Sequence, residues 1–199
     1  MMDQGAATRK RGDKLIESIY SATIEIIKNE GYGNLTFSRI SRLARTGRAV
    51  LYRRWATPLD LIHEIMAYKS SQALGGELID LIKDTGSLRG DLLYLMELYQ
   101  KIYLSVSPEI MNAVLFELSQ NNKNIPALKS DVDFRNMLVM KKLLGFAAGR
   151  GEQTKPLSDQ ALTLPFNLIR MNFLLERQAL DEKARERLAD EILIPVFFS

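Results

Sequence analysis

The stretch TFSRISRLARTGRAVLYRRW, residues 36–55, predicts two short helices joined by a tight turn. Its apolar residues recur at helical spacing on both sides of a break at Thr46 and Gly47. Thr36 is a suitable N-cap for the first helix, whose predicted inward-facing residues are Phe37, Ile40, Leu43 and Ala44. In the second helix Leu51 and Trp55 lie one turn apart, on the side predicted to be buried. This pattern is typical of a helix-turn-helix.

The same stretch carries six arginines, no lysine and no acidic residue. A guanidinium is a planar fork that can bind two acceptors on a guanine edge or two phosphate oxygens, whereas an ammonium is a point charge. A solvated basic face on an ordinary helical hairpin is the alternative, and it is the usual explanation for an isolated arginine. The arginines and the helix-turn-helix pattern together favour DNA recognition.

Further helices flank this stretch on both sides. Upstream, a helix is predicted from an N-cap at Asp13 to a stop at Gly31, with an apolar stripe of Leu15, Ile16, Ile19, Ala22, Ile26 and Ile27. Downstream, Thr57, Pro58 and Asp60 supply an N-cap, a proline at the first helical position and an acid in the first turn. These closely spaced helix starts leave no room for a sheet.

The remainder of the chain consists of leucine-rich segments with helical periodicity, separated by short breaks. The predicted helices cover residues 58–84, 88–105, 108–121, 126–148, 158–178 and 181–194. We find no repeat, low-complexity tract or strand pair among them. The predicted fold class is all-α, with an N-terminal three-helix helix-turn-helix head, a C-terminal helical bundle and about nine helices in total.

Charge is distributed unevenly along the chain. Residues 1–58 hold eleven Lys and Arg against five Asp and Glu, a net charge of +6, whereas residues 59–199 carry a net charge of −3. A basic head on a mildly acidic body is expected of a polyanion-binding module attached to a part that does not bind the polyanion. The run Arg9-Lys10-Arg11 predicts a basic N-terminal arm on the DNA, and a solvated tail is the alternative.

Composition excludes several classes of chemistry. The chain has no cysteine and a single histidine, His63, which excludes disulfides, thiolate zinc sites, thiol catalysis and a histidine-based metal cluster. It has no nucleophile elbow, phosphate-binding loop or zinc motif, so we predict neither an enzyme nor a cofactor; only carboxylate pairs, which every helical bundle contains, are left open. Without an apolar signal segment or membrane-spanning run, we expect a cytoplasmic protein with no membrane partner.

The order of these elements and several of their residues resemble the tetracycline-repressor (TetR) family of bacterial transcriptional regulators. The resemblance covers about residues 12–62 without gaps, and it rests on Gly31, Thr36, Ile40, Ser41, Leu51, Tyr52, Trp55 and Thr57. Residues 149–152 and Pro165 resemble the sequence around the last two helices of one branch of that family. The resemblance implies a repressor that binds a palindromic operator as a homodimer and is released by a small-molecule effector.

Three residues depart from the family pattern. Arg45 stands in the turn where the family usually has glycine, Gly47 opens the second helix where it has serine, and Pro58 replaces a lysine that would contact phosphate. An arginine in a left-handed turn costs about 1 kcal/mol, so either this turn differs or the strain is accepted. The departures leave an alternative function open, a helical dimeric interaction protein that has lost specific operator reading.

In a helix-turn-helix the second helix lies in the major groove, so its outward face is the predicted base reader. Arg48 is expected to bind a guanine edge, with Arg53 on the same face. Ala49 and Val50 are expected to contact thymine methyl groups.

Phosphate contacts are predicted around the base-reading face. Tyr52 and Arg54 are expected to hold phosphates from the second helix, although Tyr52 as a core aromatic is the alternative. At the first helix, the hydroxyl of Thr36 and the helix N-terminus offer a phosphate site that Arg39 and Arg42 flank. The full set of predicted DNA-contacting residues is Thr36, Arg39, Arg42, Thr46, Arg48, Ala49, Val50, Tyr52, Arg53 and Arg54.

A single head buries too little DNA surface for tight specific binding, so a two-fold dimer on a palindromic site is expected. The last two predicted helices carry more apolar residues than one face of their own subunit can bury. The predicted dimer interface consists of Leu162, Phe166, Ile169, Phe173, Leu188 and Ile192. The alternative is that these residues only complete the core of one subunit.

Methionine and tyrosine residues gather in residues 88–148, and such side chains line adaptable apolar pockets. The predicted pocket residues are Tyr94, Met96, Tyr99, Tyr103, Met111, Phe116, Met137 and Met140. By the resemblance, a small apolar or amphipathic effector binds there and shifts the helix that begins at Pro58; an ordinary core is the alternative. The predicted domains are therefore a DNA-binding domain at 1–57 and a ligand-binding and dimerisation domain at 58–199.

Overall fold

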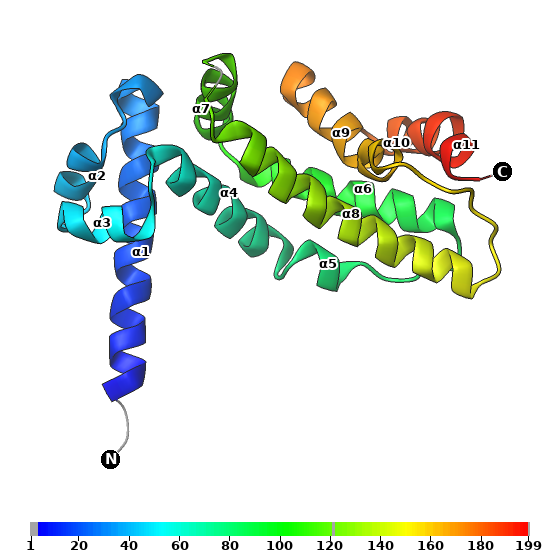
Figure 1. Ribbon diagram of the computed structural model, residues 1–199, viewed down its shortest axis with the longest axis horizontal. Coiled ribbons are helices and arrows are strands. Elements are labelled where there is room, and N and C mark those ends of the chain that lie inside the picture. The colour runs from blue at the N-terminus through cyan, green and yellow to red at the C-terminus, as the bar shows by residue number, and fades with distance from the viewer. Residues whose placement is uncertain (1–3, 121, 199) are drawn as a thin grey trace. The chain divides into compact units, whose positions relative to one another are not determined.

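The computed structural model describes residues 4–120 and 122–198, with side chains from residue 12 onward (Figure 1). Within these residues the chain is built from helices, and the only β pairing is an isolated bridge between Thr154 and Phe198. The predicted all-α fold, a helix-turn-helix head followed by a helical bundle, is confirmed. Every helix in the described part of the chain is too short or too polar to span a membrane.

The chain forms two compact units. The first, here called the head unit, comprises Met1–Tyr68 and Ser107–Asn122; the second, the body unit, comprises Lys69–Val106 and Lys123–Ser199. The head unit therefore includes a helix from the middle of the chain. The predicted domains, a DNA-binding domain at 1–57 and a ligand-binding and dimerisation domain at 58–199, are defined by function, and this division stays a prediction.

The helix-turn-helix lies in the head unit. The elements of this unit are α1 (Gln4–Glu30), the 3-10 turn η1 (Tyr32–Asn34), α2 (Phe37–Leu43), α3 (Arg48–Arg54), the first part of α4 (Pro58–Leu74) and α7 (Pro108–Ser119). Helix α2 packs against both α1 and α3. The core at these contacts includes fully buried Ile19, Ile40 and Leu51, so α2 and α3 are anchored by apolar burial.

Helix α1 begins well before the N-cap predicted at Asp13, and that prediction is wrong. Its first residue is Gln4, because Gln, Ala, Arg and Lys, all good helix formers, dominate residues 4–11. The predicted basic arm, Arg9 to Arg11, therefore has a helical backbone, while its side chains lie outside the described ones.

The predicted caps of the other head helices are confirmed. The hydroxyl of Thr36 accepts a hydrogen bond from the backbone N–H of Arg39 at 3.3 Å, which caps α2. At the start of α4, the backbone N–H and the hydroxyl of Thr57 both donate to the carboxylate of Asp60 at 2.8 Å. Gly31, with a φ of 80°, ends α1. Local sequence thus determines where these helices begin and end.

One residue predicted to face inward does not do so. Leu43 is 44% exposed, whereas Phe37, Ile40 and Ala44 are buried. Successive residues of a helix are rotated by about 100°, and Leu43 lies at the edge of the stripe that the other three define. Leu43 instead lines a hollow at the surface between α1 and α2.

The body unit is a bundle in which α6, α8 and α9 lie side by side (Figure 1). Its elements are α5 (Leu78–Leu81), α6 (Leu88–Ser105), α8 (Ile125–Gly149), α9 (Asp159–Glu176), α10 (Glu182–Leu188), the π-helical turn η2 (Ala189–Leu193) and α11 (Ile194–Phe197). The core of this bundle includes fully buried Leu92, Met96, Leu143, Phe166 and Phe197.

A partly buried ion network joins the N-terminus of α6 to the C-terminus of α8. The guanidinium of Arg150 binds Asp91 at 2.8 Å and Glu152 at 2.6 Å, and it also pairs with Asp84. Asp91 is completely buried and accepts two further hydrogen bonds from Thr85, both at 2.7 Å. The network fixes the register of two helices that form the body core.

Candidate nucleic-acid interface

Helix α3 presents one exposed and one buried face. Arg48, Ala49, Tyr52 and Arg53 are exposed, whereas Leu51 is completely buried. Trp55, which follows the helix, is also buried, with 3% of its surface exposed. The predicted division of this helix into outer and inner faces is confirmed, so its outward side chains are held on a rigid element.

Tyr52 is held against the helix-turn-helix without being buried. It is 63% exposed, and its ring meets Phe37 edge-to-face with ring centroids 4.9 Å apart. The hydroxyl group therefore stays on the surface. Val50 and Thr46 are half-buried beside this face, and Thr36 is exposed at the start of α2.

The turn between α2 and α3 places Arg45 in a left-handed conformation with a φ of 52°. The backbone N–H of Thr46 donates to the carbonyl of Ser41 at 2.9 Å, and that of Arg45 donates to Arg42 at 3.3 Å. This pair of bonds forms a Schellman motif, whose left-handed position favours glycine. The turn therefore keeps the geometry that glycine would adopt, and the strain is accepted by arginine.

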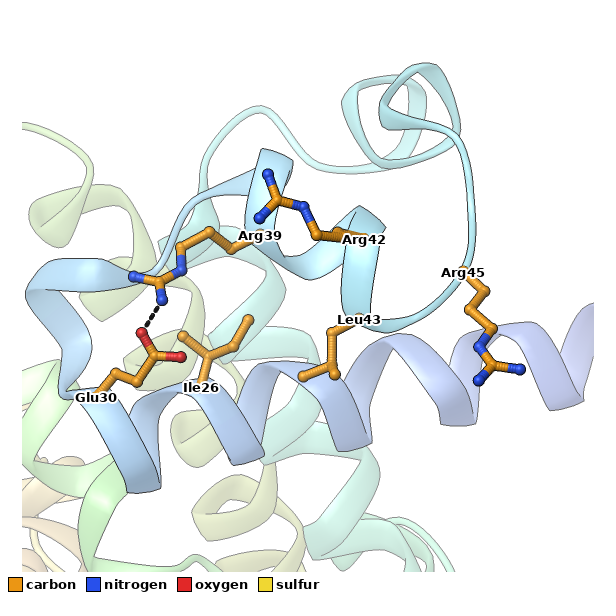
Figure 2. Close-up of a pocket in the computed structure, with 6 residues that line it drawn as sticks. All are labelled: Ile26, Glu30, Arg39, Arg42, Leu43 and Arg45. Carbon is orange, nitrogen blue, oxygen red and sulfur yellow. Dashed lines mark hydrogen bonds and ion pairs between the residues drawn. The ribbon is translucent and has the colours of Figure 1, made fainter.

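A hollow of about 390 Å³ lies between α1 and α2 beside this turn. Its lining residues are Ile26, Glu30, Arg39, Arg42, Leu43 and Arg45. Figure 2 shows Arg39 turned toward Glu30 at the end of α1, whereas Arg42 points away from α1. The hollow combines one carboxylate with three guanidinium groups, so its surface is basic.

Two of the arginines predicted to grip the DNA backbone already have partners in the head unit. Arg39 forms an ion pair with Glu30. Arg54 pairs with Glu64 at 2.6 Å, and its guanidinium lies over the ring of Trp55, 5.2 Å from the centroid. These contacts orient both side chains before any ligand binds.

Glu64 is a residue of this region that sequence reasoning missed. Its carboxylate accepts hydrogen bonds from the hydroxyl of Tyr20 at 2.7 Å, from the indole of Trp55 at 2.8 Å and from Arg54. Burial would raise the pKa of Glu64, but the hydrogen bonds from Arg54, Tyr20 and Trp55 outweigh it and hold that pKa below its ordinary value. Nothing in the local sequence signals this role, because its partners come from three other positions in the chain.

The other four arginines of the helix-turn-helix are available to a ligand. Within the described residues, no side-chain hydrogen bond or ion pair engages Arg42, Arg45, Arg48 or Arg53, and all four side chains are exposed. Two of them, Arg48 and Arg53, lie on the outer face of α3. This part of the head can therefore neutralise phosphates or bind base edges without first breaking internal contacts.

The predicted pocket residues are divided between the two units. Met111 and Phe116 lie on α7 in the head unit, where Phe116 meets the ring of Tyr32 at 5.6 Å and Glu117 accepts a hydrogen bond from Tyr32. The other six lie in the body unit: Met96 and Met140 are completely buried, Tyr99 and Tyr103 are nearly so, and Tyr94 and Met137 are half-buried.

The predicted interface residues differ in exposure. Leu162, Phe166 and Ile169 are buried within the body unit, Phe173 and Leu188 are half-buried, and Ile192 is 41% exposed. Two other apolar residues of α9, Met171 at 56% and Leu175 at 71%, are more exposed than any of these six. The spacing of apolar residues along a helix does not show which of them stay exposed once the helices have packed.

Comparisons of the sequence with known proteins identify a family. The family model described as "Tetracyclin repressor-like, C-terminal domain" matches residues 82–192. An HTH-type transcriptional regulator of Mycobacterium tuberculosis is 26% identical over 179 residues, which cover 89% of this chain and 85% of that protein. The family match lies in the body, while the match to this relative extends over most of the chain.

Solved structures share the fold. The transcriptional regulator FadR of Bacillus subtilis, in complex with stearoyl-CoA, superposes with a TM-score of 0.62 at 16% identity, covering 90% of this chain and 96% of that one. A regulator from Saccharomonospora viridis in complex with choline gives a TM-score of 0.56 at 17% identity, covering 92% and 98%. At these identities the likeness concerns the fold alone.

Proposed function

Because this chain belongs to the TetR family of transcriptional regulators, which bind DNA through a helix-turn-helix, we propose that it is a repressor that binds a palindromic operator as a homodimer. In this proposal a small apolar or amphipathic effector releases it from the operator. The protein acts in the cytoplasm, on the DNA of its own cell, and catalyses no reaction.

The observation that carries the proposal is the outer face of α3. Arg48 occupies the first helical position, is exposed and has no ion-pair partner in the described part of the chain. A guanidinium in that position binds the two acceptors of a guanine edge when α3 enters the major groove. Ala49 and the half-buried Val50 then lie next to it for contact with thymine methyl groups.

Phosphate contacts surround this reading face in the proposal. Within the described residues Arg42 and Arg45 have no ion-pair partner, and both are exposed beside the hollow, Arg42 in the last turn of α2 and Arg45 in the turn that follows. Arg39 and Arg54 each keep one carboxylate partner, so they hold phosphates as oriented rather than mobile cations. Thr36 and Tyr52 supply exposed hydroxyl groups.

Dimerisation follows from the energetics of DNA binding. One head reads only a half-site, and two-fold symmetric proteins gain affinity by reading two of them. Exposed apolar residues at the end of the body, Met171, Leu175 and Ile192, supply surface that a second copy would cover. We assign the dimer interface to α9 and to the helical segment from α10 to α11.

Release requires that the effector favour one arrangement of the heads over another. Helix α4 begins in the head unit and ends in the body unit, so it connects the two units. An effector bound among α6, α8 and α9 would act on the head through this helix. The stearoyl-CoA bound by one solved structure of the same fold is amphipathic, which supports an effector of this kind.

Binding of the protein to promoter DNA upstream of its own gene tests the proposal. Fluorescence anisotropy should give tight binding to this duplex, and affinity should fall by roughly a thousandfold between about 50 and about 200 mM salt. A scrambled duplex of the same length is the control and should bind far more weakly. Equal, weak binding to both duplexes would contradict the proposal and favour an interaction protein that has lost operator reading.

A further inference from the structure

Arg170 lies half-buried in the body unit and has no acidic partner among the described residues. It is the only charged residue between Asp159 and Glu176, in an otherwise apolar and neutral helix α9. Its guanidinium donates to the hydroxyl of Tyr103 at 2.9 Å, to the hydroxyl of Tyr99 at 3.4 Å and to the side-chain carbonyl of Asn167 at 3.1 Å. We call these four residues the Arg170 cluster.

The positive charge of this cluster is uncompensated within the described residues. No Asp or Glu forms an ion pair with Arg170, although the other arginine that is mostly enclosed in this unit, Arg150, has three carboxylate partners. Burial raises the pKa of Tyr103, so this phenol stays neutral and does not serve as a counter-ion. A cation that is partly removed from water without a counter-charge is costly, and packing of the body core does not require a cation at this position.

The cluster also has more hydrogen-bond donors than acceptors. A guanidinium carries five N–H groups, and Arg170 directs them at three acceptor atoms. Both phenol oxygens accept from Arg170, so their O–H groups point elsewhere. Even if one phenol donates to the other, one O–H group has no acceptor in the described part of the chain. An anionic acceptor would satisfy both the unused donors and the positive charge of Arg170.

We propose that the Arg170 cluster binds the acidic group of the effector, an anionic carboxylate or phosphate, while the apolar part of that effector packs against neighbouring aromatic rings. The half-buried ring of Phe173, with its centroid 5.4 Å from that of Tyr103, is one such surface. Arg170 is itself only half-buried, so an anion can reach it. This inference rests on the proposed function, because it assigns the charge of the effector; a quaternary ammonium such as choline would be repelled.

Calorimetric titration of the full-length protein in the absence of DNA tests the assignment. The probes are decanoate, decyl phosphate, decanol and decyltrimethylammonium, each below its micelle concentration. The two anions should bind on the order of tenfold or more tightly than the alcohol, because charge-assisted hydrogen bonds add to the same apolar contact. The stronger of the two anions identifies the acidic group as carboxylate or phosphate. Tighter binding of the alcohol or the ammonium compound would overturn the proposal.

Substitutions distinguish an arginine that binds the ligand from one that only stabilises the fold. Arg170→Gln should weaken the anions by on the order of tenfold and leave decanol unchanged. Arg135→Gln removes the same charge from an exposed position of α8 and should change nothing. If Arg170→Gln does not fold, Tyr103→Phe keeps the guanidinium, removes one donor and should weaken the anions several-fold.

Two outcomes distinguish this inference from the proposed function. Anion affinity that is equal in the wild type and Arg170→Gln, or absent in both, overturns the inference even if the protein binds its promoter. If anion binding depends on Arg170 but the protein binds no DNA sequence specifically, the inference is supported and the proposed repressor function is contradicted.

Discussion

At the scale of single residues, Arg45 combines a conformational cost with a position beside the reading helix. Its φ of 52° is in the left-handed region, where a side chain is disfavoured, and its guanidinium is exposed on the rim of the hollow. A glycine would relieve the strain, but it would also remove one of the unpaired charges of the head. In the proposed complex with DNA, this residue gives up stability in return for a positive charge near the phosphates.

Two substitutions separate these effects. Arg45→Gly should be more stable than Arg45→Ala by about 1 kcal/mol, because both lack the charge and only alanine keeps the strained Cβ. Urea unfolding of the two variants measures this difference, and both should bind DNA more weakly than the wild type. Equal stabilities of the two variants would show that this turn is not strained.

Arg48 and Arg54 should differ in what their loss does to DNA recognition. Arg48→Ala should reduce discrimination at one base pair in each half-site by about 1–3 kcal/mol, whereas Arg54→Ala should weaken binding to all sequences alike. Competition binding against all single-base variants of the operator measures both effects. Loss of affinity in both variants without altered base preference would mean that the two roles are wrongly assigned.

Glu64 should make the stability of the head depend on pH. Its pKa is below the ordinary value of 4.5, so it stabilises the fold when ionised, and this stabilisation is fully present above that value. It is lost as the pH falls through the lower pKa of the folded state. The difference in melting temperature between the wild type and Glu64→Gln should therefore shrink as the pH is lowered below 4.5. Parallel curves for the two proteins would contradict this role of the carboxylate.

At the scale of helices, local signals predicted most of the boundaries. The single helix predicted over residues 58–84 is wrong, because the chain breaks at Gly75, whose φ is 74°, and forms two helices, α4 and α5. The predicted helix at 88–105 coincides with α6, because Ser87 caps its start and the segment has clear helical periodicity. The start of α1 was missed because no strong breaker separates residues 4–11 from the rest of the helix. The packing of α7 in the head unit was also missed. Its contact between Tyr32 and Phe116 joins distant parts of the chain and has no local signal.

The network at the ends of α6 and α8 should contribute strongly to stability. Asp91→Ala leaves Arg150 without its buried partner and should cost about 3 kcal/mol in the free energy of unfolding. Lys101→Ala, which removes the exposed pair of Lys101 with Glu97 on the same helix, should cost less than about 0.5 kcal/mol. Urea unfolding compares the two, and similar small losses would show that the network does not hold the helices together.

At the scale of the whole molecule, the sequence predicted the exposed face of α3 better than the arrangement of the body residues. The arginines of α3 are close in sequence and share one face of one helix, so periodicity alone predicts their exposure. The body residues depend on which helix faces meet, and six of the predicted pocket residues lie in a different unit from Met111 and Phe116. Arg170 did have a signal that went unused, a single charge within an apolar helix.

Selection of DNA from a random-sequence pool by the full-length protein decides whether it reads an operator. The selected sequences should contain an inverted repeat whose half-sites are separated by one or more helical turns, with a guanine in each half-site that is no longer selected by Arg48→Ala. A pool that shows no enriched sequence, or the same sequences with the wild type and with Arg48→Ala, would contradict a dimeric repressor that reads DNA through α3.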